Sequence, residues 1–342
     1  MRTVEVLVQH ALDPASSHAI DLQLLGRAAD RPRRMTLRAY QLAGEGLSLG
    51  RYHLAPVGDP GRRVGLHRRL GGGRVLPFGP GVATLSLTLP HRSGLVSDDP
   101  LALRPEQALN RCVRALLGGL RRLGVDAFYA GRDRVTVNQR MLGLVSLETD
   151  QDGATVFEAV LATGDCWARF ADLATAVDPA GVVAAEIPAP AQVASLADLG
   201  PRPALEDLAT GVAGALAQEF GLTVTAGSAP TVPPQAAVDA ATWVASRRLR
   251  PGLDRHAVEW GQLGVFEVYL AAPAGTIDDL LFAGDFLADS PSIARLEARL
   301  RGCRRDRAAV AAVVDAVYAD PRSFLLGVGP LQTVVDTIVR AA

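Results

Sequence analysis

Lysine is absent from this sequence of 342 residues, because all 35 residues counted as lysine or arginine are arginine. The chain therefore has no amine side chain that could act as a nucleophile, form a Schiff base or hold a phosphate as a point charge. The composition of a high-GC genome, which also favours Ala, Gly, Val and Leu, explains this absence. A protein that avoids modifying itself at lysine is the alternative interpretation.

Cysteine is also scarce, and Cys112, Cys166 and Cys303 lie far apart in the sequence. This number and spacing argue against a disulfide framework and against a thiolate zinc site. No uncharged apolar run is long enough to span a bilayer, and the first residues lack the apolar segment of a signal peptide. We therefore expect a soluble protein in a reducing cytoplasm, with no membrane partner.

The chain also lacks a large excess of positive or negative charge, since its formal net charge is -1. This balance gives no reason to expect a nucleic-acid partner. The six histidines are scattered, and no two of them have metal-ligand spacing on a helix, so no metal site is expected. The hydrophobic fraction of 49% is ordinary for a globular protein, and the length is sufficient for two domains.

Local patterns predict an α/β (α+β) chain. Helical spacing, capping residues and terminal glycines predict helices at 14–29, 105–123, 204–220 and 290–301. Alternation and turn residues predict strands at 36–42, 46–54, 82–89, 134–148 and 154–164, with two more within 264–287. The proline-rich stretch 228–234 is the best linker candidate between a domain at 1–230 and a smaller α+β domain at 245–342.

The segment RRLGGGRVLPFGPG (68–81) begins with an arginine pair that is followed by three successive glycines, and it is the best candidate for anion binding. The pair is Arg68 and Arg69, and the successive glycines are Gly71, Gly72 and Gly73. Backbone N–H groups of successive glycines can approach a phosphate or acyl phosphate closely, and an arginine can add a charged hydrogen bond. A tight turn with two solvated arginines is the alternative interpretation.

Three segments together resemble the lipoate–protein ligase branch of the biotin/lipoate ligase and octanoyltransferase superfamily. Segment 68–81 resembles the family's Arg-Arg…Gly-Gly-Gly loop, and GRDRVTVNQRMLGLVS (131–146) resembles its Gly-Arg-Asn-Asp strand with the lysine motif. Segment 264–302, with its Gly-Asp-Phe turn, is similar to the family's accessory domain. The segments occur in family order. The resemblance implies a mixed-sheet catalytic-type domain over 1–230 and the accessory domain over 245–342.

The resemblance also implies an activity, cofactors and a partner. The enzymes of this family activate lipoate or octanoate with ATP and Mg²⁺. They then acylate a lysine on a lipoyl carrier domain of a 2-oxoacid dehydrogenase or of the glycine cleavage system. The residues implied to surround the ligand are Arg68, Arg69, Gly71, Gly72, Gly73, Arg132, Asp133, Arg140 and Met141.

The positions that should perform this chemistry depart from the family pattern. Met141 stands where the family has its lysine, and a methionine cannot neutralise charge at an acyl-adenylate. The adjacent Arg140 points to the opposite face of an unbroken strand. The family's Asn-Asp pair appears as Asp133-Arg134, which places a cation where a carboxylate would help to hold Mg²⁺. The family's His-Gly pair appears as Phe157-Glu158.

A thioester route is not supported either. Related octanoyltransferases hold the acyl group on a cysteine, but the similar turn here has Ala180 in that place, and Cys166 lies elsewhere. Two main hypotheses remain. The chain is a degenerate family member that keeps a ligand cleft or a surface for the carrier domain, or it is an active ligase whose arginines replace the lysine. An unrelated function on the same fold is a third.

Overall fold

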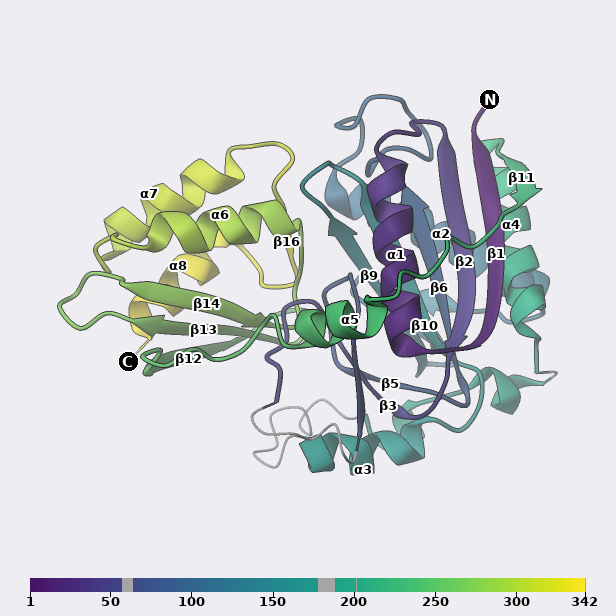
Figure 1. The fold of residues 1–342 in the computed structure, drawn as a ribbon, viewed down its shortest axis with the longest axis horizontal. Coiled ribbons are helices and arrows are strands. Elements are labelled where there is room, and N and C mark those ends of the chain that lie inside the picture. The colour runs from purple at the N-terminus through teal and green to yellow at the C-terminus, as the bar shows by residue number, and fades with distance from the viewer. Residues whose placement is uncertain (57–63, 178–187, 201, 342) are drawn as a thin grey trace.

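The structure is a computed structural model that describes residues 1–56, 64–177, 188–200 and 202–341. Ala180 lies outside these residues. The chain forms two parts that lie side by side along the long axis of the molecule, with the C-terminal residues in the smaller part (Figure 1). Among the described residues, no helix has both the length and the apolar character needed to cross a bilayer.

A mixed eight-stranded sheet forms the centre of the larger part. Its order is β11-β1-β2-β6-β10-β9-β8-β7; β1 runs parallel to both of its neighbours, and the other pairs are antiparallel. The strands are β1 (Thr3–Leu12), β2 (Arg34–Leu42), β6 (Val82–Leu89), β7 (Phe128–Tyr129), β8 (Arg134–Val137), β9 (Arg140–Thr149), β10 (Thr155–Ala162) and β11 (Thr223–Ala226). Helix α1 (Pro14–Ala28) covers one face, and α2 (Pro105–Arg122) and α4 (Leu205–Phe220) cover the other (Figure 1).

A small second sheet carries the glycine-rich segment. It has the order β4-β3-β5 and consists of β3 (Gly46–Leu49), β4 (Gly65–Arg68) and β5 (Leu76–Phe78). Helix α3 (Trp167–Val177) packs against β3 and β5. The glycines therefore lie in the loop that joins β4 to β5.

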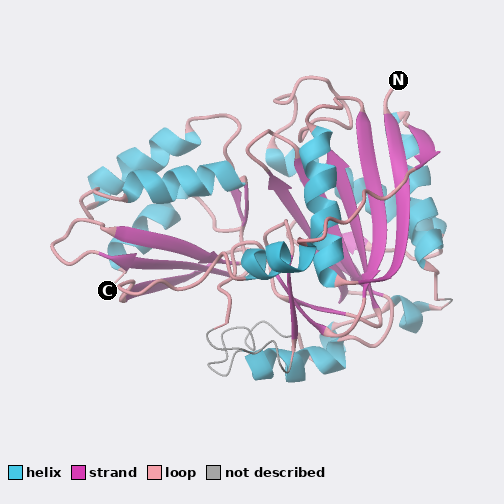
Figure 2. Cartoon of the chain, viewed as in Figure 1, coloured by secondary structure: helices cyan, strands magenta, loops and turns pink. Residues whose placement is uncertain are grey.

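The smaller part has its own sheet and its own hydrophobic core. Strands β12 (Arg255–Trp260), β13 (Val265–Ala271) and β14 (Asp279–Gly284) form an antiparallel sheet, and β15 (Leu287–Ala288) pairs with β16 (Leu325–Leu326). Its helices are α6 (Ser290–Leu300), α7 (Arg307–Tyr318) and α8 (Leu331–Arg340). Figure 2 shows these helices gathered on one side of the three-stranded sheet. Phe266 and Phe282, at most 1% exposed, stack at the centre of this core.

Most of the predicted elements are present, with two corrections. The predicted helices correspond to α1, α2, α4 and α6, and the strand at 82–89 is β6. The single strand predicted at 134–148 is wrong, because Asn138 and Gln139 adopt left-handed φ values of 49° and 64° and turn the chain into a β8–β9 hairpin. The strand predicted at 46–54 ends at Leu49.

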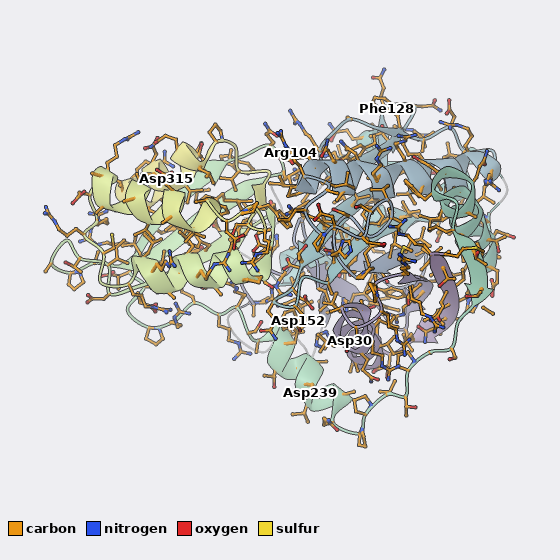
Figure 3. All side chains as sticks on the ribbon, turned by 90° about the horizontal axis from the view of Figure 1, so that it is seen from above. Asp30, Arg104, Phe128, Asp152, Asp239 and Asp315 are labelled. Carbon is orange, nitrogen blue, oxygen red and sulfur yellow. The ribbon has the colours of Figure 1, made fainter. Side chains whose placement is uncertain are left out.

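Helix α5 (Ala236–Val244) follows the predicted linker and lies between the two parts (Figures 1 and 3). It packs on α1, and its Trp243 donates an indole hydrogen bond to the carbonyl of Arg68 (3.0 Å). The division into domains at 1–230 and 245–342 remains a prediction.

The junction between the two parts is held by aromatic and polar contacts. The ring of Tyr52, which is fully buried, stacks on Phe286 with a centroid distance of 4.4 Å. Glu148, at the end of β9, is fully buried and accepts hydrogen bonds from the Ser290 N–H at the start of α6 (2.7 Å) and from the Tyr52 hydroxyl (3.1 Å). Burial raises the pKa of Glu148 from 4.5 to about 8.

The raised pKa of Glu148 predicts a pH dependence of stability. From about pH 5 to about pH 8 the folded chain keeps a proton that the unfolded chain has released, so the stability contributed by this group is lost as the pH rises. The free energy of unfolding should fall by up to about 1.4 kcal/mol per pH unit from this group. Glu148→Gln should flatten the dependence in urea titrations, whereas Glu106→Gln, at an exposed position, should not. Equal slopes for all three proteins would contradict this assignment.

Candidate functional site

The glycine loop between β4 and β5 lies directly on strands β9 and β10. The N–H of Gly71 donates to the carboxyl group of Glu158 at 2.8 Å. A Cβ atom on Gly71 would lie only 2.2 Å from Ser146 Oγ and 2.4 Å from Glu158 Oε2. Gly71 is therefore required by the close approach of the loop to the sheet.

The other side of the loop is covered by the C-terminal part. A Cβ atom on Gly72 would lie 2.2 Å from the carbonyl oxygen of Phe286, and the N–H of Gly73 donates to that same oxygen (3.1 Å). Phe286 belongs to the Gly-Asp-Phe turn after β14. The N–H groups of Gly71 and Gly73 thus already have partners within the chain.

Both arginines of the pair are buried, so the interpretation as a turn with solvated arginines is wrong. Arg68 is fully buried, and its guanidinium donates to the carbonyl oxygens of Gly50, Arg51, His53 and Val244. Burial, with repulsion from nearby arginines, lowers the pKa of Arg68 to about 9. Arg69 is 4% exposed and donates to the carbonyls of Ser48, Gly72 and Arg74. The Arg69 side chain thus holds the loop in its conformation, and the Arg68 side chain connects the end of β4 to the segment after β3 and to the end of α5.

Glu158 places a carboxyl group of the chain itself against the glycine loop. Its side chain is 1% exposed and accepts hydrogen bonds from Gly71 and from the Ser146 hydroxyl (3.3 Å). Burial raises the pKa of Glu158, and the positive charge of Arg69 opposes that rise. The space left between loop and strands is about 10 Å³, which is about the room that one water molecule needs.

The second motif provides one buried carboxyl group beside this loop. Asp133 is 1% exposed, and its Oδ2 accepts from Arg74 Nε at 2.9 Å, while Oδ1 is buried without a hydrogen-bond partner. Mg²⁺ requires several oxygen ligands. Within the described ranges, no group of three or more His, Cys, Asp or Glu residues could hold a metal ion. A single carboxyl group paired with an arginine does not fit Mg²⁺. Arg132 is exposed and does not join the loop.

Met141 faces the same side of the sheet as the loop but lies in an apolar cluster. The β8–β9 pairing shifts register so that Leu142 is an extra residue facing the main core, while Met141 packs with Leu76, Leu144 and Val160. Met141 is 6% exposed. Its side chain therefore fills space instead of lining an open channel. Arg140 is half-buried beside the hairpin turn, away from this cluster.

Cys166 belongs to the same apolar cluster and is 3% exposed. Burial raises the pKa of its thiol to about 12, so the thiolate that a thioester mechanism needs is not formed at neutral pH.

A hollow of about 400 Å³ between α1, β4 and α5 was not predicted from the sequence. Among the residues that line it are Ala15, His18, Leu66, Ala240, Trp243 and Arg248. His18 stacks on Trp243 with a centroid distance of 5.4 Å, and burial lowers the pKa of His18 to about 4. The sequence gives little indication of this hollow, because no periodic pattern predicts helix α5, which carries Trp243.

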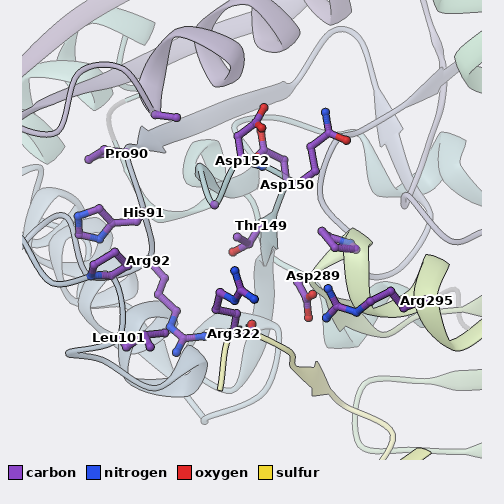
Figure 4. Close-up of a pocket in the computed structure, with 15 residues that line it drawn as sticks. Pro90, His91, Arg92, Leu101, Thr149, Asp150, Asp152, Asp289, Arg295 and Arg322 are labelled. Carbon is purple, nitrogen blue, oxygen red and sulfur yellow. Dashed lines mark hydrogen bonds between the residues drawn. The ribbon is translucent and has the colours of Figure 1, made fainter. Parts of the chain in front are cut away.

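A further hollow of about 370 Å³ lies at the junction of the two parts, near the start of α6 (Figure 4). Arg92, Arg295, Arg322 and Asp289 face it. Arg92 donates to three backbone carbonyls, and Asp289 accepts from Ser292 and Phe324. None of the residues that the sequence predicts for the site lines this hollow.

Comparison with known proteins agrees with this fold. Residues 255–321 match the family model described as bacterial lipoate protein ligase C-terminus. No curated protein sequence matches the chain. LipL1 of P. falciparum, solved in complex with lipoate, is 13% identical and has a TM-score of 0.71 over 98% of this chain and 99% of that chain.

Two further structures match about 70% of this chain. The putative lipoate protein ligase Ta0514 from T. acidophilum, with bound lipoic acid, has a TM-score of 0.52 at 16% identity over 70% of this chain and 94% of that chain. A lipoate-protein ligase A bound with ATP has a TM-score of 0.50 at 15% identity over 71% and 94%. The fold and the resemblance predicted from the sequence are thereby confirmed: the chain has the lipoate–protein ligase fold, and residues 255–321 match the model of that family's C-terminus.

Proposed function

We propose that this chain is a lipoate–protein ligase-like protein that binds an acyl acid or a lipoyl carrier domain and does not form an acyl-adenylate. The observation that carries this proposal is the hydrogen bond from Gly71 to Glu158. The loop that would hold the phosphate of an adenylate holds a carboxyl group of the chain itself.

The remaining groups offer no replacement for the missing lysine. Arg68 and Arg69 are used by backbone carbonyls, and Met141 is packed among apolar side chains. Removing one polar contact to a transition state typically costs a few kcal/mol, so losing a lysine and a metal carboxylate together should leave little ligase activity. An active ligase that uses arginines is the alternative, and it predicts that the loop opens.

The hollow between α1, β4 and α5 supports binding of an acyl acid. Its volume of about 400 Å³ lies in the range of small-molecule sites, and its walls include the apolar side chains of Ala15, Leu66 and Trp243. Arg248, exposed at its rim, can meet a carboxylate. Lipoate and octanoate combine such an apolar chain with one carboxylate.

A carrier domain as partner is supported by the relatives. The structural study of the T. acidophilum bipartite ligase includes its E2 lipoyl domain, and that ligase has a TM-score of 0.52 with this chain. ATP, which is bound in a further relative, enters our proposal only through the alternative of an active ligase.

An acylation assay separates the two functions. A lipoyl domain incubated with this protein, ATP, Mg²⁺ and octanoate or lipoate should show no mass increase above a control without the protein. An intact lipoate–protein ligase in a parallel reaction verifies the carrier and the reagents. Acylation of the carrier by this protein would overturn the proposal in favour of the active ligase.

Binding of the free acid can be tested by filling the hollow. Ala240→Trp places a large ring against its wall, and calorimetry should then show octanoate binding weakened roughly tenfold or more, since a filled pocket excludes the chain. Thr242→Trp, on the exposed side of the same helix, should bind octanoate like the wild-type protein. Equal affinities of all three proteins would place the acyl site elsewhere.

A further inference from the structure

A third hollow, of about 330 Å³, lies where three segments of the chain meet. Arg51 follows β3, Trp243 and Arg247 lie at and after the end of α5, and Ser290 begins α6. Ser246 is exposed at its rim. Trp243 lines both this hollow and the proposed acyl site. The other lining residues of the two hollows differ.

Aromatic rings hold the two arginines of this hollow. The guanidinium carbon of Arg51 lies 4.8 Å from the ring centroid of Trp243, and that of Arg247 lies 5.4 Å from the centroid of Tyr52. A guanidinium stacked on a ring keeps its N–H groups directed outward in its own plane. The side chains of Arg51 and Arg247 are 20% and 17% exposed, so both are accessible from the hollow.

The balance of charge around these arginines is positive. Arg68 lies close by, because Arg247 and Arg51 are the charges that, after burial, most lower its pKa. Glu148 pairs with Arg51 at 3.8 Å, and burial raises the pKa of Glu148 to about 8, which favours its neutral form. Glu297 pairs with Arg247 at 2.5 Å. The three guanidinium groups therefore outnumber these two carboxyl groups.

We propose that the hollow between Arg51 and Arg247 binds a phosphate group, either free or at the end of a small molecule. Two guanidinium groups from different segments can donate to a dianion from two sides, and such charged hydrogen bonds are stronger than those that the guanidinium groups make to neutral carbonyls. A bound phosphate would connect the larger part, the segment after α5 and α6. It therefore stabilises the arrangement of the two parts. This site goes beyond the proposed function, since its lining shares Trp243 alone with the acyl hollow and includes none of the three loop glycines.

Calorimetry and thermal unfolding with inorganic phosphate, at constant ionic strength maintained with chloride, test the proposal. The wild-type protein should bind phosphate saturably and gain thermal stability. Ser246→Glu adds a carboxylate at the rim without removing a buried contact, and it should weaken phosphate binding roughly tenfold or more. Leu249→Glu changes the net charge by the same amount at an exposed neighbouring position outside the lining of the hollow and should leave phosphate binding unchanged.

AMP and adenosine identify the source of the phosphate. The binding of inorganic phosphate and that of AMP should both be weakened by Ser246→Glu, and adenosine should not bind at this site. Tighter binding of AMP indicates a phosphate ester, and equal binding indicates free phosphate. No saturable phosphate binding to the wild-type protein, or equal losses in Ser246→Glu and Leu249→Glu, would overturn the proposal. The acylation assay does not depend on this outcome.

Discussion

The hydrogen bond between the Gly71 N–H and the Glu158 carboxyl group determines the state of the candidate site. It holds the glycine loop against β9 and β10, where a side chain on Gly71 would collide with Ser146 and Glu158 itself. The C-terminal part completes the enclosure, because the Phe286 carbonyl accepts from Gly73. The glycine loop, whose composition led us to expect that it binds an external anion, thus contacts a carboxyl group of the same chain.

The same enclosure explains how the two parts of the molecule depend on one another. Tyr52 stacks on Phe286 and donates to Glu148, and Glu148 in turn accepts from the first turn of α6. These contacts are connected to the glycine loop through Phe286, whose carbonyl accepts the hydrogen bond from Gly73. Opening the loop therefore requires displacement of the C-terminal part as well as of Glu158, and in our proposal this opposes the binding of an adenylate.

Much of the fold could be predicted from the sequence, and less of the site. Strand β6 and helices α1, α2, α4 and α6 have strong local signals in alternation, caps and terminal glycines. The β8–β9 hairpin was missed because Asn138-Gln139 lacks the glycine that usually marks such a turn. The substitution at Met141 was visible in the sequence, but the contact of Glu158 with Gly71 joins residues 87 positions apart, and only the register of the two sheets reveals it.

Calorimetry with a non-hydrolysable octanoyl-adenylate analogue tests most directly whether Glu158 closes the loop. The wild-type protein should bind the analogue weakly. Glu158→Ala frees the Gly71 N–H and the charge of Arg69 and should tighten binding roughly tenfold or more, the value of one charge-assisted hydrogen bond. Glu259→Ala, which removes a carboxylate paired with Arg340 on the surface, should change nothing. Tight binding by the wild-type protein that Glu158→Ala weakens would contradict the role assigned to Glu158.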